Sequence, residues 1–185
     1  IEYGKTKSPQ KENQKKFSNT FSYYGKAKLL STKLLLKLFK EYKLPVTILR
    51  LYLVYGPKQD VNRIIPITIF NSIKNKKFDC SSGKQLRDFI YIDDVIEAII
   101  KTLKNESVSG EIINIGSGHP ITIKKIIKTI CRLIQGGHPV FGKIKLRKDE
   151  ILMLYPNISK AKKLLKWKPK TNLITGLKKT IKYLN

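Results

Sequence analysis

The sequence predicts an α/β protein, and three observations support this class. Apolar residues recur at helical spacing over residues 22–42 with lysines between them, which is the pattern of an amphipathic helix. Residues 46–54 are a nearly continuous apolar and β-branched run, typical of a strand covered on both faces in a parallel sheet. Helical and strand-like segments then alternate to the end of the chain without an internal repeat.

Breaking residues define the elements of the first third of the chain. Residues 5–20 are polar and have no apolar period, so we expect a surface loop there. Pro45 follows the helix predicted over residues 22–42, and Gly56-Pro57 ends the strand that comes next.

Later elements have weaker signals. Residues 63–75 predict a helix, residues 89–92 a short strand, and Asp93 and Asp94 the start of a helix that runs to about Leu103. We interpret both carboxylates as helix-start residues rather than catalytic ones. The remaining elements are predicted to be a strand, a helix with Thr122 as its N-cap, an extended segment and two amphipathic helices, over residues 111–115, 122–133, 138–150, 157–165 and 174–184. About three strands are convincing, which is few for a complete doubly wound sheet and fits a piece of a larger fold.

The net charge of +25 comes from 38 Lys plus Arg against 13 Asp plus Glu. Such a charge can indicate a nucleic-acid or anionic-membrane partner. Here, however, 33 of the cations are lysines spread over every segment rather than clustered as in a nucleic-acid-binding protein. We therefore expect no nucleic-acid or membrane partner, and a basic nucleic-acid-binding module is the alternative of another class.

Other features of the sequence argue against a membrane-spanning chain, a signal peptide, a disulfide framework and a metal site. No apolar stretch has the length of a membrane span, and residues 1–5 do not resemble a signal peptide. Cys80 and Cys131 form no CxxC motif, and His119 and His138 have no partners at metal-ligand spacing. We predict a cytoplasmic location and no metal site.

Tyr24 and Lys28 have the spacing YxxxK, which places a phenol and an ammonium one helical turn apart. A neighbouring ammonium stabilises a phenolate, so such a phenol can exchange a proton with a hydroxyl or carbonyl while a nicotinamide takes or returns a hydride. Tyr3 and Lys7 have the same spacing, and two matches are about what chance gives for 9 Tyr in this lysine-rich chain. Context favours Tyr24, because its helix leads directly into the buried strand.

Arginine is more informative than lysine in this sequence, because a lysine-rich chain would keep arginine where a planar, forked donor is needed. Four of the five arginines lie in the motifs that follow: Arg50, Arg63, Arg87 and Arg147.

A series of short motifs occurs in order along the whole chain. They are Glu2-Tyr3-Gly4, Tyr24-Gly25-x-x-Lys28, Leu49-Arg50-Leu51-Tyr52-Leu53-Val54-Tyr55-Gly56-Pro57, Arg87-Asp88-Phe89-Ile90-Tyr91-Ile92-Asp93-Asp94-Val95, Asn114-Ile115-Gly116-Ser117-Gly118, Ser159-Lys160-Ala161 and Trp167-Lys168-Pro169. In this order they resemble the C-terminal half of the NAD-dependent nucleotide-sugar epimerase/dehydratase family, the extended short-chain dehydrogenases/reductases.

The resemblance implies the C-terminal part of a Rossmann-type doubly wound parallel sheet plus a smaller α/β substrate-binding domain. Residues 1–57 would belong to the NAD-binding domain, and residues 58–185 mainly to the nucleotide-sugar domain, with some segments returning to the sheet. The family's G-x-x-G-x-x-G turn is absent from the sequence, and its catalytic Ser or Thr would precede Ile1. We expect these 185 residues to be inactive alone.

The resemblance also assigns candidate site residues. Tyr24 would be the catalytic acid/base, Lys28 would favour its phenolate and hold the nicotinamide ribose, and Tyr52 would lie beside the nicotinamide of NAD or NADP. A second set would bind the nucleotide-sugar diphosphate and the nucleotide end: Arg63, Arg87, Arg147 and Glu150. Arg50, within a strand, is expected to pair internally.

The implied function is that of an NAD(P)-dependent nucleotide-sugar epimerase or 4-ketoreductase, with a 4,6-dehydratase of the same family as the alternative. Dehydratases of the family carry Asp-Glu just before the segment that begins with Glu2, and Ile1 occupies one of these positions. Leu53 replaces an Asn that contacts substrate in the family, so the sugar pocket is expected to differ. A homodimer acting in cell-envelope or surface polysaccharide synthesis is the family-level expectation.

Overall fold

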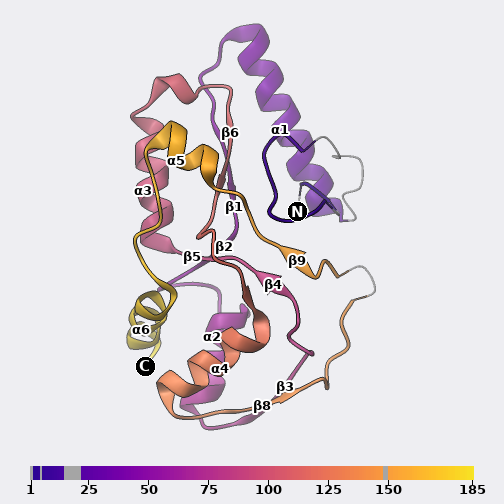
Figure 1. The fold of residues 1–185 in the computed structure, drawn as a ribbon, viewed down its shortest axis with the longest axis vertical. Helices are drawn as coiled ribbons and strands as arrows, with labels where there is room; N and C mark the ends of the chain where they lie inside the picture. Colours follow the sequence, from indigo (N-terminus) through magenta and orange to yellow (C-terminus); the bar gives the residue numbers. More distant parts are fainter. Residues whose placement is uncertain (1, 5, 15–21, 148–149) are drawn as a thin grey trace.

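The computed structural model describes residues 2–4, 6–14, 22–147 and 150–185, and it confirms the predicted α/β class (Figure 1). Its helices are α1 Tyr23–Tyr42, α2 Ile64–Ile73, α3 Ile92–Leu103, α4 Ile123–Ile134, α5 Ser159–Leu165 and α6 Leu173–Leu184, with a short 3₁₀ helix at Glu106–Val108. These bounds agree with the predicted helices to within two residues at nearly every end. In the described part of the chain, no helix has both the length and the apolar character needed to cross a membrane.

The described residues form nine strands, so the prediction of about three strands is wrong. All of these strands are short. They are β1 Ile48–Leu51, β2 Leu53–Tyr55, β3 Lys77–Cys80, β4 Leu86–Arg87, β5 Phe89–Tyr91, β6 Ile112–Ile115, β7 Ile121–Thr122, β8 His138–Phe141 and β9 Met153–Leu154. Four ladders are parallel, β1 with β6, β2 with β5, β3 with β8 and β4 with β9, while β4 with β7 is antiparallel. Segments of two to four residues are too short to show a period in the sequence.

The apolar run at 46–54 forms two strands rather than one. The Tyr52 N–H donates to the Ile115 carbonyl at 3.0 Å, and the next N–H, of Leu53, donates to the Asp88 carbonyl at 3.0 Å. The chain therefore leaves the β6 ladder and joins the β5 ladder at one peptide. An apolar pattern reports burial and not pairing partners, so this exchange is invisible in the sequence.

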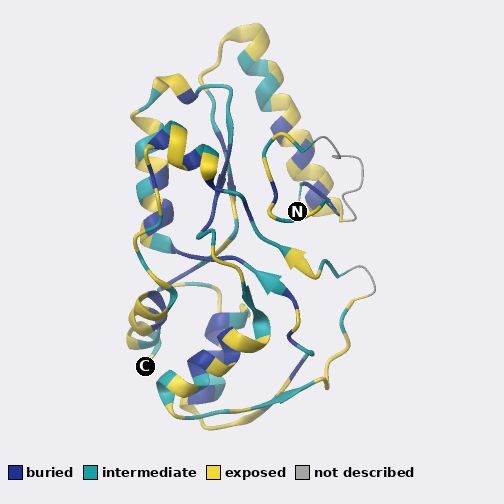
Figure 2. Cartoon of the chain, in the orientation of Figure 1, coloured by how far each residue is buried: buried dark blue, intermediate teal, exposed yellow. Residues whose placement is uncertain are grey.

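Two apolar clusters hold the elements together. One joins α2, α4 and α6 to β2 and β5, through Tyr55, Ile65, Ile69, Phe89, Tyr91, Ile126, Ile127, Ile130 and Leu177. The other joins α3 and α5 to β5 and β6, through Ile90, Val95, Ala98, Ile113, Ile115, Ala161, Leu165 and Trp167. In Figure 1, α3 and α5 lie on one side of the β1–β6 ladder and α1 on the other. Most residues of α1 are exposed, and only three of the twenty, Gly25, Leu29 and Thr32, are buried (Figure 2).

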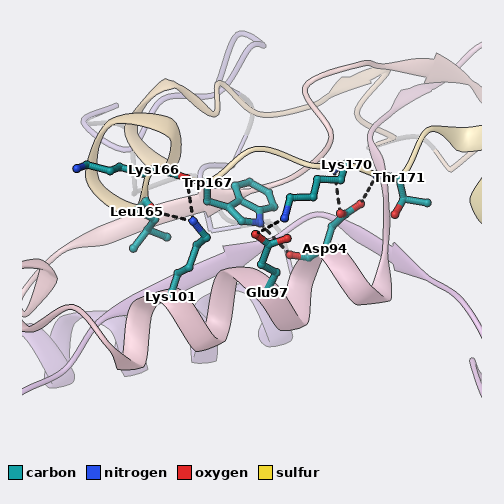
Figure 3. Close-up of polar contacts among 8 residues, drawn as sticks. All are labelled: Asp94, Glu97, Lys101, Leu165, Lys166, Trp167, Lys170 and Thr171. Atoms are coloured by element: carbon teal, nitrogen blue, oxygen red, sulfur yellow. Dashed lines mark hydrogen bonds and ion pairs between the residues drawn. The ribbon is translucent and has the colours of Figure 1, made fainter.

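Asp94 anchors the C-terminal segment to α3 (Figure 3). Its carboxylate accepts the N–H groups of Lys170 at 2.9 Å and Thr171 at 3.1 Å, and its carbonyl accepts the indole N–H of Trp167 at 3.0 Å. Lys101, two turns along α3, donates to the carbonyl of Lys166 at 2.9 Å. The helix-start interpretation of Asp94 holds, and its carboxylate has the added task of fixing the chain between α5 and α6.

The predicted surface loop at residues 5–20 is wrong for part of its length, although residues 5 and 15–20 lie outside the described residues. Gln10 is fully buried. Its N–H donates to the Tyr155 carbonyl at 2.9 Å, and its carbonyl accepts the Asn157 N–H at 2.8 Å. A polar segment can be buried when its hydrogen bonds are made inside the protein, which composition alone does not reveal.

Candidate functional site

Tyr24 and Lys28 lie at the start of α1, where the N-cap Ser22 accepts the N–H of Gly25 at 3.0 Å. The Lys28 ammonium is 5.7 Å from the centroid of the Tyr24 ring, and 61 % of Tyr24 is exposed. The predicted pair is therefore together and accessible. Contact alone does not distinguish it, because Lys26 lies 5.8 Å from the ring of the neighbouring Tyr23.

Glu2 connects α1 to the strand that follows it. Its carboxylate accepts the Thr32 hydroxyl of α1 at 2.8 Å and the Arg50 Nη2–H of β1 at 2.6 Å. The Arg50 guanidinium also lies 4.3 Å from the centroid of the Tyr3 ring. The expected internal pairing of Arg50 is confirmed, and it fixes the helix that carries Tyr24 against β1.

A buried polar cluster surrounds the end of β1. The Asn114 side chain in β6 accepts the Tyr3 hydroxyl at 2.7 Å and donates to the Gln10 carbonyl at 2.9 Å. Tyr52 donates its hydroxyl to Gln10 Oε1 at 2.8 Å. Burial raises the pKa of the Tyr52 phenol well above its ordinary value, so Tyr52 is a fixed hydrogen-bond donor rather than a proton-transfer group.

Sequence reasoning missed Gln10 and Asn114. Gln10 carries no signal of its own in a polar stretch. Asn114 does carry one, because an amide inside the apolar strand at 112–115 requires buried partners.

Arg87 and Glu150 form an ion pair and hydrogen bond between β4 and the chain that precedes β9. A second guanidinium nitrogen of Arg87, Nη1, donates to the Leu86 carbonyl at 2.8 Å. Burial lowers the pKa of Arg87 from its ordinary value, and the Glu150 carboxylate opposes this shift. Two of the four residues predicted to bind a diphosphate or nucleotide are thus joined.

The other two predicted arginines are exposed to solvent. Arg63 is the N-cap of α2 without a side-chain capping bond. The Arg147 carbonyl accepts the Glu150 N–H at 3.1 Å, which places Arg147 one turn of chain away from the ion pair. Arg63 and Arg147 are therefore accessible from solvent.

Asp88, next to Arg87, is a further residue that the sequence reasoning left without a role. Its buried carboxylate accepts the Ser117 N–H at 2.6 Å, the Ser117 hydroxyl at 2.9 Å and the Gly118 N–H at 2.7 Å. Burial raises the pKa of Asp88, and these hydrogen bonds oppose the shift. Asp88 fixes the Gly116-Ser117-Gly118 turn beside the base of β4.

A hollow of about 540 Å³ lies between residues 11–13, Glu111 and Lys160, and none of the predicted site residues lines it. Among the described residues, no group of three His, Cys, Asp or Glu side chains gathers as a metal site would require.

The chain resembles known proteins along most of its length. Residues 1–116 match the family model described as the NAD dependent epimerase/dehydratase family. The UDP-glucuronate 4-epimerase of Thermodesulfobacterium geofontis is 36 % identical over 154 residues, which cover 77 % of this chain and 44 % of that protein. The dTDP-D-glucose 4,6-dehydratase of Homo sapiens is 34 % identical over 151 residues, covering 78 % of this chain and 43 % of that protein.

A solved structure of a 4-epimerase has the same fold as this chain. The structure of UDP-glucuronic acid 4-epimerase from Bacillus cereus, in complex with UDP-glucuronic acid and NAD, superposes with a TM-score of 0.88 at 29 % identity, over 99 % of this chain and 58 % of that one. The predicted Rossmann-type architecture is thereby confirmed. The chain spans about half the length of the curated relatives it matches.

Proposed function

The chain belongs to the NAD dependent epimerase/dehydratase family, and from this premise we propose that the whole protein is an NAD(P)-dependent nucleotide-sugar epimerase or 4-ketoreductase. The observation that carries the proposal is the accessible Tyr24–Lys28 pair at the start of α1, in a chain with these relatives. We also propose the division at residues 57/58 into an NAD-binding part and a mainly nucleotide-sugar-binding part.

Tyr24 and Lys28 would perform the acid–base step. When a sugar hydroxyl is oxidised to a carbonyl, its carbon loses a hydride and its oxygen loses a proton. The Tyr24 phenolate accepts that proton, and the reverse step returns it. The Lys28 ammonium, 5.7 Å from the centroid of the Tyr24 ring, would be the cation that accompanies the phenol during this proton transfer.

The residues present fit one end of the cofactor. Lys28 is exposed, and an ammonium with three N–H donors suits the hydroxyls of the nicotinamide ribose. Tyr52, held by Gln10, would border the nicotinamide. NAD, when bound, supplies a reversible hydride acceptor. The sequence has no G-x-x-G-x-x-G turn, so the dinucleotide phosphates would be held by another part of the whole protein.

The arginines would hold the substrate. Arg87 would provide a largely buried guanidinium, and Arg63 and Arg147 would provide side chains at exposed positions, which suits a diphosphate that carries more than one negative charge. Glu150, paired with Arg87, would be the acidic member of the set.

A 4,6-dehydratase is the second candidate, since the relatives include such an enzyme. Ile1 favours the epimerase or ketoreductase, because dehydratases of the family have an acidic residue there. Assays of the whole protein with UDP-glucose, UDP-glucuronate, dTDP-glucose and a nucleotide-linked 4-keto sugar would decide among these activities. A 4-epimer or, from a 4-keto sugar with NAD(P)H, a 4-hydroxy sugar is the expected product, whereas a 4-keto-6-deoxy sugar would show a dehydratase. No conversion of any nucleotide sugar, together with tight and steeply salt-dependent binding to DNA or RNA, would favour the basic nucleic-acid-binding module instead.

We further propose that the whole protein is a homodimer. On α1, Leu30 is 64 % exposed and Leu34 is 57 % exposed, so an apolar stripe on this helix has no cover in the described chain. Light scattering of the whole protein tests this, with a monomer mass at micromolar concentration as the contradicting result.

A further inference from the structure

The Arg87–Glu150 pair lies where the sheet brings two distant segments together. β4 and β9 are parallel neighbours, with Arg87 opposite Leu154, and the Leu86 N–H donates to the Leu152 carbonyl at 2.7 Å. This ladder places Glu150 beside β4. The side chains of Arg87 and Glu150 are 11 % and 24 % exposed, so most of the pair is removed from water.

The contacts restrict how Arg87 can meet another anion. A guanidinium has two edges that can offer paired N–H donors, and Nη2 belongs to both of them. Glu150 takes Nη2, while Nη1 donates to the Leu86 carbonyl. Because Nη2 carries two N–H groups, one on each edge, a phosphate that takes the N–H now bonded to Glu150 requires that carboxylate to move away.

Carboxylate and phosphate are the two anions whose oxygens fit the guanidinium fork. Glu150 thus presents to Arg87 the same chemistry that a ligand phosphate would present. It also supplies an opposite charge to a largely buried cation.

We propose that Glu150 competes with the ligand's phosphate for Arg87: its carboxylate pairs with the guanidinium, and a diphosphate binds by displacing it. This inference rests on the proposed role of Arg87 and deepens it. Exchange of one carboxylate charge for a more highly charged diphosphate is favourable, whereas exchange for a singly charged anion gains little, so Glu150 would make the site selective for diphosphates.

The displaced Glu150 carboxylate can move toward solvent. Glu150 is more exposed than its partner, and Arg147, one turn of chain earlier, carries an exposed guanidinium. The side chain can turn toward solvent without unpairing the β4–β9 ladder.

The test is the affinity of the whole protein for inorganic pyrophosphate, measured by calorimetry, because this probe carries the phosphates without a base or sugar. The apparent dissociation constant is the intrinsic constant divided by the competent fraction, so a pair formed in about nine molecules of ten weakens binding about tenfold. E150Q should therefore bind pyrophosphate about tenfold more tightly than the parent protein. E150D, which keeps the charge on a shorter side chain, should fall between them.

Two controls separate this effect from a general change of charge. E97Q makes the same chemical change at the Lys170–Glu97 pair on α3, and it should leave pyrophosphate affinity unchanged. In the double variant R87K/E150Q the gain should disappear, because it requires the fork of Arg87.

Equal or weaker binding by E150Q and E150D would overturn the inference, since a carboxylate that only orients Arg87 helps binding. A gain that persists in R87K/E150Q, or that E97Q reproduces, would also overturn it. UDP binding to the parent protein tests the proposed function separately: if UDP binds and E150Q shows no gain, the inference alone fails. If neither UDP nor pyrophosphate binds to the parent protein or to E150Q, the proposed function fails with it.

Discussion

The indole N–H of Trp167 donates to the main-chain carbonyl of Asp94 at 3.0 Å, and the carboxylate of the same aspartate accepts two N–H groups from residues 170 and 171. One residue at the start of α3 thus holds the chain between α5 and α6 by three hydrogen bonds. Since Trp167 is 1 % exposed and lies in the cluster with β6, this contact joins the last third of the chain to its core.

D94N should lower the free energy of unfolding by about 1–3 kcal/mol, because an amide oxygen replaces two charged acceptors and its NH₂ faces N–H donors. The matched control is D93N. Asp93 is adjacent, is 59 % exposed and meets Lys179 at 3.5 Å, so its loss should change stability by less than about 0.5 kcal/mol. Urea unfolding of both variants measures the difference, and equal destabilisation by the two would contradict the anchoring role of Asp94.

Y24F should lower turnover by about 10²–10⁴-fold in the whole protein while the KM for the nucleotide sugar changes little, because only the proton-transfer group is removed. Y23F is a close control, since Tyr23 is the preceding residue, is 91 % exposed and has a lysine ammonium at 5.8 Å. Turnover close to that of the parent protein in Y24F, or an equal loss in Y23F, would remove Tyr24 from its proposed role.

Tyr3 and Asn114 should be energetically coupled. Their hydrogen bond of 2.7 Å is buried, so Y3F leaves the Asn114 Oδ1 without that donor, at a cost of about 1–2 kcal/mol. N114L removes the acceptor and the donor to Gln10 together, and it should cost more. A double-mutant cycle should give a coupling energy of at least about 0.5 kcal/mol. Additive effects in chemical unfolding would show that the bond contributes nothing.

Local patterns in this sequence report helices, but they do not report which strands pair. Helix α4 follows directly from its period and from Thr122, whose hydroxyl accepts the Lys125 N–H at 3.2 Å as the N-cap prediction requires. The exchange of partners at Tyr52 does not follow, because pairing depends on residues more than 35 positions away in the chain. Local pattern also places Tyr24 with Lys28, one turn apart on α1.

The rest of the candidate site depends on tertiary contacts. Arg87 meets Glu150 beside a two-residue ladder, and the main chain of Gln10 is hydrogen-bonded to Tyr155 and Asn157, far along the chain. Neither arrangement has a period or a spacing that a sequence displays, although the rarity of arginine does mark Arg87. Asn114 is the exception, because an amide within an apolar strand indicates buried hydrogen-bond partners.

Leu53 is the residue with which the choice of sugar can be tested. It begins β2, immediately after the change of partners at Tyr52, and it is 39 % exposed. An aliphatic side chain cannot hydrogen-bond a sugar hydroxyl, so a hydroxyl that it faces loses its contacts with water without compensation. L53N should therefore raise kcat/KM about tenfold for a fully hydroxylated hexose such as that of UDP-glucose, relative to a deoxy-hexose nucleotide. Leu51, two positions earlier and 46 % exposed, supplies the control L51N, for which the ratio should stay constant. If L53N leaves the ratio of the two kcat/KM values unchanged, Leu53 does not face the sugar, and the departure from the family's Asn at this position has no bearing on substrate choice.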